Sequence, residues 1–552
     1  MRRVIAAVFL FVIATAASAQ QPPAAAAASA HPLATAAGMK ILGKGGNAFD
    51  AAVAVAATLA VVEPYAAGLG GGFWMLHRAR DDRDVMVDGR EVAPRAATST
   101  MYQDKAGNVI EGASLNGPLS AGIPGQAAAF VYIAAHYGNL TLKTTLAPAI
   151  KVARDGFVVT PRYQEMAKLR LAELRASPAA AAIFLHNNEV PPLGYRIRQP
   201  DLANTLSLLA EKGRDGFYAG EVARKLVRGS RVAGGIWSQE DLAAYQVKER
   251  EPIRFSYNGY RIITAPPPSA GGVALATILN VYGLLPTQKA DAVQRAHYLV
   301  EAMRRAYRDR AEFLGDPDFV AVPVKRLMSE SYAEQLAKTI APDRATPSDS
   351  LKTAGDVPSG DHTTHISILD RDGNRVAATM SINYAFGSCF VAPGTGVLLN
   401  DEMDDFAAKP NNPNVYGLVG ESANAIAPGK RMLSSMTPTF VEGPDRIAIL
   451  GTPGGSRIIT MVLQTILGVT EGESVEAIVR MPRYHHQYLP DDIQYEDGAL
   501  TEKQRIRLEA MGYKLTQIDD GFGNMQVVIW DRRRNVVTAA SDPRGEGAAQ
   551  VR

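Results

Sequence analysis

The sequence has little cysteine, little excess charge and few long apolar runs. Cys389 is the single cysteine in 552 residues, so no intramolecular disulfide can form, and no motif around it indicates a catalytic thiol. The net charge of +2, without a long basic block, argues against a nucleic-acid partner. Beyond the first residues no segment is apolar for long enough to predict a membrane-spanning helix in the mature chain.

Apolar residues are nevertheless plentiful, at 47% of the chain, which is enough for a packed core. The length allows about two to four average domains or one large two-lobed unit. The N-terminus, MRRVIAAVFLFVIATAASA, has two arginines, a short apolar run and an A-x-A site. This pattern predicts a signal peptide over residues 1–19, cleaved after Ala19, and therefore a soluble protein exported to the periplasm. An uncleaved membrane anchor is the alternative interpretation.

Several segments predict how the first two thirds of the chain are organised. Residues 20–30, QQPPAAAAASA, are low in complexity and predict a tether. AFDAAVAVAATLAVVEP, from Ala48, is apolar almost throughout, which predicts a buried helix. GLGGGFWML, from Gly68, predicts glycines leading into a strand. The mostly polar residues 341–358, rich in Pro, Ser and Thr, predict an exposed linker.

The last third of the chain changes character. HISILD-RDGN-RVAATMSIN predicts a strand, an Asp-Gly turn and a second strand. RIAILGTPGG predicts a strand running into glycines, followed by the helical pattern SRIITMVLQTIL, and MQVVIWDRRRNVVTAAS predicts a second hairpin. Paired strands with helices between them favour an α+β layered domain over a βαβ array.

The stretch GDHTTHISILD places Thr363 immediately before the first of these strands. A threonine hydroxyl is a weak nucleophile, but at the first position of a chain its own α-amino group, with a pKa of about 7.7–8, can take its proton. Cleavage of the polar loop before Thr363 would create such a terminus. The strand-to-glycine turn GTPGGSR would supply backbone N–H groups to an oxyanion, with Gly454 and Gly455 as the candidates.

The residues alone leave other interpretations open. A threonine pair often begins a strand, because threonine favours strands. The PGG turn would also suit a tight turn or a phosphate cradle, although it lacks the spacing of a P-loop, and GLGGG lacks that of a dinucleotide site. His485 and His486 would suit a metal, but neither HExxH nor paired CxxC is present. The absence of GxSxG argues against a serine α/β-hydrolase.

At this point the chain resembles the γ-glutamyltranspeptidases, which are self-cleaving N-terminal-nucleophile hydrolases. The resemblance runs from HPLATAAG at His31 to SDPR at Ser541, nearly the whole mature chain. Between them, eleven motifs occur in order: GGNAFDAAVA, GLGGG, DGREVAP, PLSAGIPG, PPPSAGG, TTH, NDEMDDF, NPNVYGLVG, KRMLSSMTPT, GTPGGSRIIT and PRYHHQ. One motif alone would be weak, whereas the ordered set is specific.

The resemblance implies a four-layer αββα sandwich built from two self-cleaved subunits. Cleavage between His362 and Thr363 would give a large subunit, 31–362, and a small subunit, 363–552, which together form a heterodimer. Thr363 would attack a γ-glutamyl amide such as glutathione, form an ester and release an amine. Water, an amino acid or a peptide would then take the glutamyl group. No metal or organic cofactor is implied.

The resemblance also implies which residues hold the substrate. Arg90, in DGREVAP, would pair with the α-carboxylate, because a guanidinium can bind both oxygens. Ser434 and Ser435 would be further donors to the carboxylate, and Glu402 and Asp405 would accept from the α-ammonium, with Asn383 nearby. The hydroxyl of Ser381 would orient Thr363. Tyr416 would be the gate of a lid over about residues 410–421. Many relatives have threonine at the position of Ser381.

Two alternatives compete with this function. A cephalosporin or glutaryl acylase would share the fold and the self-cleavage. A glutaryl group has no ammonium, however, so it would gain nothing from Glu402 and Asp405. An uncleaved, inactive homologue with a binding or structural role is the other alternative, and it would remain a single polypeptide.

Overall fold

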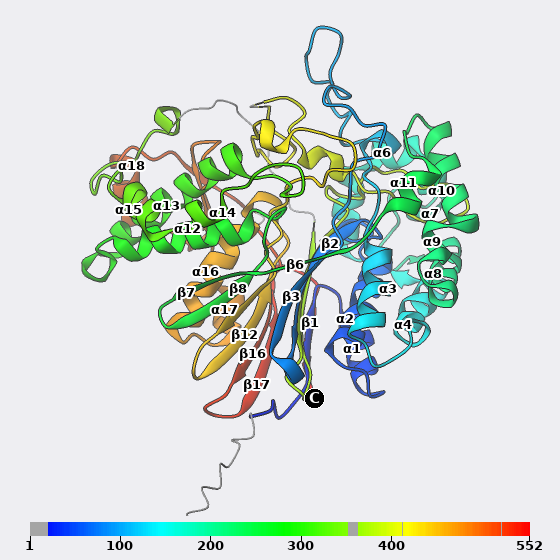
Figure 1. Ribbon diagram of the computed structural model, residues 1–552, viewed down its shortest axis with the longest axis horizontal. Helices are drawn as coiled ribbons and strands as arrows, with labels where there is room; N and C mark the ends of the chain where they lie inside the picture. The colour runs from blue at the N-terminus through cyan, green and yellow to red at the C-terminus, as the bar shows by residue number, and fades with distance from the viewer. Residues whose placement is uncertain (1–19, 352–362, 411, 520) are drawn as a thin grey trace, which may run out of the picture.

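The computed structural model describes residues 20–351, 363–410, 412–519 and 521–552; the predicted signal peptide and His362 lie outside them. Two β-sheets form the centre of the molecule (Figure 1). The seven-stranded sheet has the order β18 (Ala548–Val551), β1 (Ala26–Ser29), β9 (Thr364–Leu369), β10 (Arg375–Ser381), β2 (Gly71–Arg78), β3 (Arg83–Asp88) and β6 (Lys248–Arg250). The six-stranded sheet has the order β17 (Val536–Ser541), β16 (Gln526–Asp531), β12 (Arg446–Gly451), β11 (Thr439–Glu442), β8 (Tyr260–Thr264) and β7 (Ile253–Tyr257).

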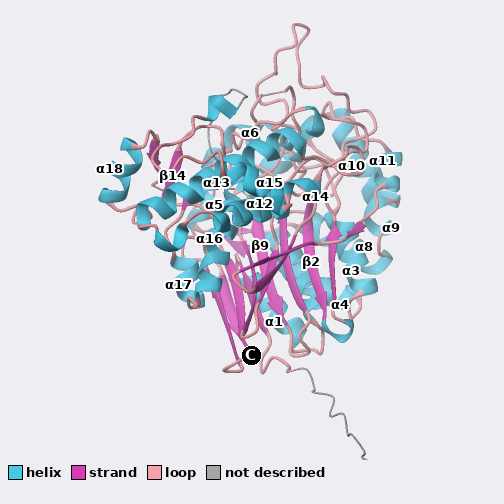
Figure 2. Cartoon of the chain, turned by 60° about the vertical axis from the view of Figure 1, so that its left-hand side comes forward, coloured by secondary structure: helices cyan, strands magenta, loops and turns pink. Residues whose placement is uncertain are grey.

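Helices cover the outer face of each sheet, as Figures 1 and 2 show. The seven-stranded sheet packs on α1 (Pro32–Leu42), α2 (Ala48–Val62), α3 (Gln126–His136), α4 (Leu142–Asp155) and α8 (Pro200–Lys212). The six-stranded sheet packs on α12 (Gly271–Leu284), α13 (Ala292–Phe313), α15 (Glu330–Ala337), α16 (Ile458–Glu471) and α17 (Val475–Arg480).

Side-chain alternation along the strands builds three apolar layers between these elements. In β2, Trp74 and Leu76 belong to the core under α1–α4, whereas Phe73 and Met75 belong to the core between the sheets. This is the period of two expected when both faces of a sheet are buried. The predicted four-layer αββα sandwich is therefore confirmed.

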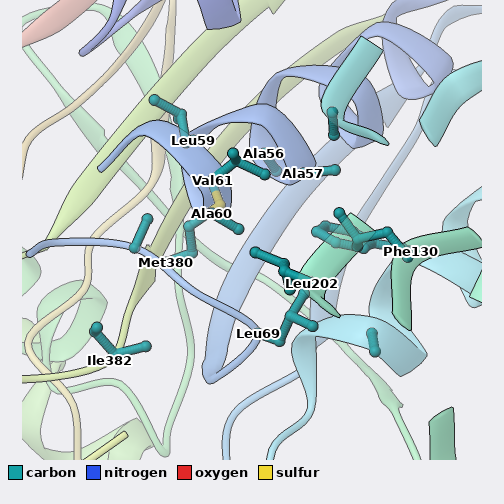
Figure 3. Close-up of a cluster of buried hydrophobic side chains, with 14 of the residues drawn as sticks. Ala56, Ala57, Leu59, Ala60, Val61, Leu69, Phe130, Leu202, Met380 and Ile382 are labelled. Carbon is teal, nitrogen blue, oxygen red and sulfur yellow. The ribbon is translucent and has the colours of Figure 1, made fainter. Parts of the chain in front are cut away.

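The helix predicted from Ala48 is α2, and every one of its residues is buried. It begins at a capping box in which the Asn47 side chain accepts the Asp50 N–H and the Asp50 carboxylate accepts the Asn47 N–H. Figure 3 shows its C-terminal turns beside Met380 and Ile382, which flank Ser381 at the end of β10. The apolar helix thus supports the strand end that carries Ser381.

The predicted Asp-Gly hairpin is β9 and β10, which pair antiparallel with Thr364 opposite Met380. Along β9, Ile366 and Ile368 face the helices, and Leu369 faces the other sheet. Because successive strand residues alternate, Thr363 is in register with the face toward the six-stranded sheet and Thr364 with the helical face.

The prediction of a tether over residues 20–30 is wrong. Residues 26–29 form β1, a fully buried strand that pairs with β9 on one side and with the C-terminal strand β18 on the other. Ala26 and Ala28 lie in the core between the sheets, while Ala27 lies in the core under α1 and α2. A run of alanines is small enough to fit between two tightly packed layers, and composition alone does not distinguish that strand from a linker.

The exposed linker predicted over 341–358 agrees with most of its described part, 341–351, in which Ser348 is the one buried residue. Ser348 is fully buried: its N–H donates to Asp491 at 2.7 Å and its hydroxyl to the Tyr488 carbonyl at 2.7 Å. Arg304 of α13 contacts the same hydroxyl. Ser348 therefore anchors a mostly exposed segment to the core. Among the described helices, none is long and apolar enough to cross a membrane.

Candidate active site

A pocket of about 20 Å³ lies at the start of β9. Nine of the residues that the sequence singled out line it: Thr363, Ser381, Asn383, Glu402, Asp405, Tyr416, Ser434, Ser435 and Gly455. They come from positions spread over more than 90 residues, so the fold brings together what the sequence separates. Two of the described residues predicted for the site do not line the pocket: Arg90, which lies behind its wall, and Gly454. His362 is outside the described residues.

Thr363 and Ser381 face each other across the β9–β10 pair. Their hydroxyl oxygens are 3.3 Å apart, and both residues are buried. The Ser381 oxygen accepts the backbone N–H of Asn383 at 2.8 Å. Asn383 has a positive φ of 73°, and its side-chain amide donates to the Asp401 carbonyl at 3.1 Å. The turn after β10 therefore fixes the Ser381 hydroxyl next to Thr363.

His365, the histidine of the TTH motif, packs inside the sandwich. One ring nitrogen is 2.8 Å from the Thr379 hydroxyl and the other is 3.2 Å from the Ser367 hydroxyl. Burial lowers the pKa of His365 to about 3, so the ring is neutral. A side chain at Gly451 would collide with this ring. His365 thus spaces β9 from β12 and does not titrate near neutral pH.

Arg90 has no exposed surface and is held at both ends. Its backbone N–H donates to Asp88 at 2.9 Å, and its carbonyl accepts the Tyr245 hydroxyl at 2.8 Å. Its guanidinium contacts the Glu402 carboxylate and donates to Asp405 at 2.5 Å. The residues predicted for opposite ends of the substrate therefore pair with each other in this structure.

The pocket wall carries an excess of buried carboxylates. Burial raises the pKa of Glu402 to about 7 and also raises that of Asp405. Glu91, next to Arg90, has its pKa raised well above the usual range by burial and by the charge of Glu402. Within the described part of the chain, neither Glu91 carboxylate oxygen has a hydrogen-bond partner. Although burial works against it, the charges of Glu402 and Asp405 raise the pKa of Arg90.

The segment 412–421 covers the pocket and is tied to its acidic wall. The Tyr416 hydroxyl donates to the Asn383 carbonyl at 2.8 Å. The Asn414 amide donates to Asp405 at 3.1 Å, and the Val415 N–H donates to Asp404 at 3.0 Å. Burial raises the pKa of Asp404 to about 7. The covering segment and the carboxylates below it form one hydrogen-bonded unit.

Gly454 and Gly455 follow β12 with φ angles of 136° and 53°. A side chain at Gly455 would collide with the Tyr416 ring, so only glycine fits beneath the covering segment. Among the described residues, neither N–H of this pair donates a hydrogen bond within the protein. The turn can therefore offer donors to a bound group, and Gly455 does so from the pocket wall.

Thr363 also lines a second and much larger space, a cavity of about 850 Å³. Its wall includes α5 (Pro161–Leu169), the end of α2 and the segment near Arg544. Among the described residues, the charged ones that line it are Glu63, Arg162, Glu165, Lys168, Arg457, Arg544 and Glu546. Thr363 therefore lies where a small pocket meets a much larger cavity.

Sequence reasoning missed several charged residues at this centre. Arg310 of α13 is buried and donates to the Ser435 hydroxyl at 3.4 Å, and the charge of Asp405 acts on it. Glu63 at the end of α2 also went unnoticed. The signal for Arg310 was the arginine-rich helix RRAYRDRAEF, which resembles an ordinary solvent-facing pattern. The signal for Glu63 was a single acidic residue directly after a wholly apolar helix.

One group of three possible metal ligands occurs among the described residues: His77, Asp84 and Glu442. Arg254 is 3.3 Å from Asp84, and Arg261 contacts Glu442. These arginines already balance the carboxylates, so the donor set suits an ion-pair network better than a divalent cation.

His485 and His486 are both buried, and their rings contact different partners, so the two side chains do not form a shared metal site. His485 lies 2.7 Å from the Thr460 hydroxyl, and His486 lies 3.2 Å from Asp491. Both rings serve packing between α16 and the neighbouring loops.

The sequence profile described as "Gamma-glutamyltranspeptidase" matches residues 34–551. The chain belongs to this family. It is 44% identical to a "Glutathione hydrolase proenzyme" of Pseudomonas sp. (strain A14), over 88% of this chain and 85% of the relative. It is 41% identical to the protein of the same name from Escherichia coli (strain K12), over 94% and 90% of the two chains. Among solved structures, it is similar to the cephalosporin acylase from Bacillus halodurans, with a TM-score of 0.83, 28% identity and 99% of each chain covered.

Proposed function

We propose that the chain is a self-processing γ-glutamyltransferase and glutathione hydrolase with Thr363 as its nucleophile. The observation that carries this proposal is the convergence of nine separately predicted residues on one pocket beside Thr363. Membership of the family and the similarity to glutathione hydrolase proenzymes support it. Cleavage after His362 releases Thr363 as the first residue of a small subunit, 363–552, paired with the large subunit that precedes it.

The acylation step needs one base and one oxyanion site. The Thr363 α-amine takes the proton from its own hydroxyl, and the oxygen attacks the γ-carbonyl carbon of the substrate. Ser381, at 3.3 Å, orients that hydroxyl. The N–H groups of Gly454 and Gly455 stabilise the oxyanion, and the α-ammonium then protonates the departing amine. The product is a γ-glutamyl ester on Thr363.

Recognition of the glutamyl group proceeds by exchange of ion pairs. In the closed pocket Arg90 pairs with Glu402 and Asp405. When substrate binds, its α-carboxylate pairs with Arg90, and its α-ammonium replaces the guanidinium as the partner of Glu402 and Asp405. Ser434 and Ser435 donate to the same carboxylate, and Arg310 adds a second cation at that end. A ligand that lacks either charge leaves buried groups unpaired, which is a strong source of specificity.

The covering segment must move for this exchange. A space of about 20 Å³ holds little more than one water molecule, and a γ-glutamyl group is far larger. Tyr416 and its bond to Asn383 form the gate, and Asn414 ties that gate to Asp405. Binding of the substrate ammonium at Asp405 competes for the bond that holds the segment, so lid opening and substrate entry are linked.

A glutaryl or cephalosporin acylase is the second candidate function, because the similarity to the Bacillus halodurans cephalosporin acylase spans the whole chain. The two buried carboxylates beside Arg90 favour a substrate with an ammonium. Hydrolysis of a γ-glutamyl anilide and of a glutaryl anilide, compared on one preparation, separates the two: the γ-glutamyl function requires a strong preference for the first.

We also propose that the chain is exported to the periplasm after removal of residues 1–19, on the sequence pattern alone. N-terminal sequencing of the large subunit from a periplasmic fraction should begin at Gln20. A large subunit that still begins at Met1 would contradict cleavage.

The deciding experiment for the function is a denaturing gel with N-terminal sequencing, run on the wild type and on Thr363→Ala. We expect two wild-type bands, the smaller beginning Thr-Thr-His, together with γ-glutamyl anilide cleavage. The variant should give one band and no activity. A wild type that stays uncleaved after long incubation and releases no anilide would refute the proposal in favour of an inactive homologue.

A further inference from the structure

Glu63 is a buried acid beside the nucleophile for which the reaction described so far has no use. It follows the last residue of α2, is 4% exposed, and lines the large cavity together with Thr363. Its Oε2 accepts the Thr364 hydroxyl at 2.9 Å. Among the described residues this is the one side-chain hydrogen bond that it accepts. An unshared carboxylate oxygen thus remains next to the strand that carries Thr363.

The charged and titratable groups around Glu63 come from three elements. Arg162 of α5 and Glu546 of the C-terminal segment act on it electrostatically, and Tyr65 lies beyond the end of its own helix. The Arg162 N–H donates to Glu546 at 3.3 Å, so its backbone holds that second acid in place. Burial raises the pKa of Glu63 to about 7; the Thr364 hydroxyl and Arg162 oppose the rise, and Glu546 adds to it. Glu63 therefore changes charge near neutral pH.

Transfer to an amine raises a proton problem that hydrolysis does not. When water attacks the ester, one proton goes to the Thr363 α-amine and then to the departing Oγ. An amino acid or peptide arrives as an ammonium, which must lose one proton before its nitrogen can attack and a second during the attack. The α-amine can hold only one of the two. A second base facing the incoming amine is needed near neutral pH.

We propose that Glu63 is this second base, and that it binds the ammonium of the acceptor in the large cavity. The inference rests on the proposed function. Glu63 takes the first proton from the acceptor ammonium. The neutral nitrogen then bonds to the γ-carbonyl carbon, the carbon–Oγ bond breaks, and the second proton passes through the α-amine to Oγ. The proton on Glu63 leaves through the cavity to solvent.

The first test compares Glu63→Gln with wild type in three reactions of the cleaved enzyme with a γ-glutamyl anilide. These are hydrolysis, transfer to glycylglycine, and transfer to hydroxylamine, which is already neutral at neutral pH. We expect glycylglycine transfer to fall at least about tenfold at pH 7; loss of a general base typically costs about a hundredfold or more when the reactant depends on it fully. Hydrolysis and hydroxylamine transfer should change by less than about twofold, well below that range.

The pH dependence gives a readout that a structural role would not produce. As pH rises above the acceptor's own pKa, the acceptor arrives neutral and no longer needs Glu63. The glycylglycine deficit of Glu63→Gln should therefore shrink toward high pH. Glu165→Gln is the matched control, because it makes the same change on an exposed acid of the same cavity, and it should affect the ratio of transfer to hydrolysis far less.

Thr364→Val offers a second variant should Glu63→Gln fail to mature. It removes the hydroxyl that stabilises the ionised acid, so the rise of glycylglycine transfer with pH should move to higher pH while hydroxylamine transfer does not move. Equal loss in all three reactions, or none, would overturn the inference. So would a wild type that hydrolyses but transfers to no amine, although the hydrolase function would then stand. Failure to cleave the anilide at all would instead refute the proposed function.

Discussion

The small pocket at Thr363 has a volume of about 20 Å³, whereas the cavity that the same residue lines has about 850 Å³. The pocket is walled by buried groups that pair with one another, Arg90 with Glu402 and Asp405. The cavity is walled largely by partly exposed side chains such as Arg162 and Glu165, which pair at the surface. Buried charges must be matched by a ligand, and exposed charges can be matched by water.

This difference assigns selectivity to one side of the nucleophile and tolerance to the other. The pocket accepts a group that replaces its internal ion pairs charge for charge, which a γ-glutamyl group does. The cavity has room for many amines, and five of the seven described charged residues on its wall are at least partly exposed, so water can match their charges. A transferase that uses one donor group and many acceptors needs this asymmetry.

The largest expected effect is that of Arg90→Lys. An ammonium keeps the charge but cannot bridge Glu402 and Asp405 as a planar guanidinium does. Because breaking a buried pair costs about 3–5 kcal/mol, we expect kcat/KM for a γ-glutamyl anilide to fall by about two to four decades. Arg95→Lys, on an exposed side chain that pairs with Asp241 at 3.9 Å, is the control. A loss for Arg90→Lys no larger than that of the control would remove Arg90 from the pocket's function.

Asp405→Asn is expected to have the next largest effect. The amide keeps the shape but loses the charge that faces the substrate ammonium. A hydrogen bond to a charged group is worth about 1.5–3 kcal/mol, so kcat/KM for the γ-glutamyl anilide should fall about tenfold to a hundredfold. Self-cleavage, read on a gel, and any residual activity on a glutaryl anilide should change little. Equal loss of cleavage and of γ-glutamyl activity would contradict the assigned role.

The hairpin of β9 and β10 and the helix α2 could be predicted from sequence because their signals are local: an Asp-Gly turn between alternating runs, and a long apolar segment with a cap. The strand β1 could not, because its partners, β9 and β18, lie more than 300 residues away in the chain. The burial of Ser348 within a mostly exposed segment could not be predicted for the same reason, since the groups that bury it belong to α13 and to the segment near Asp491.

The identities of the pocket residues followed from motifs, but their pairing did not. No motif tells that Arg90 meets Glu402 and Asp405 when the pocket is closed, because that contact depends on how the covering segment packs. Arg310 was hidden because its helix has an ordinary amphipathic pattern, and burial there is decided by the loop that carries Ser435.

A smaller effect is expected from pH acting on the acidic wall. Burial raises the pKa of Asp404 to about 7, above its value in the unfolded chain. The folded state therefore binds more protons between about pH 4 and pH 7, and ionisation of Asp404 lowers the free energy of unfolding as pH rises through that window. The amide in the variant Asp404→Asn cannot ionise. The free energy of unfolding of this variant, measured in urea relative to that of the wild type, should therefore rise by at least about 1 kcal/mol from pH 5 to pH 8. A constant difference would show that Asp404 is already charged at pH 5.

The smallest effect should come from Lys168→Ala, in the wall of the large cavity. Lys168 is exposed, and among the described residues it has no ion-pair partner, so an acceptor gains little by meeting a charge that water already solvates. We expect the KM for glycylglycine, and for single amino acids with acidic, basic and apolar side chains, to change by less than about twofold, the usual range for a surface substitution. The order of preference among those acceptors should also stay the same. A tenfold loss confined to acidic acceptors would show that the cavity recognises its ligand by a fixed cation. The contrast between a selective pocket and a tolerant cavity would then have to be abandoned, because both sides of Thr363 would select by charge.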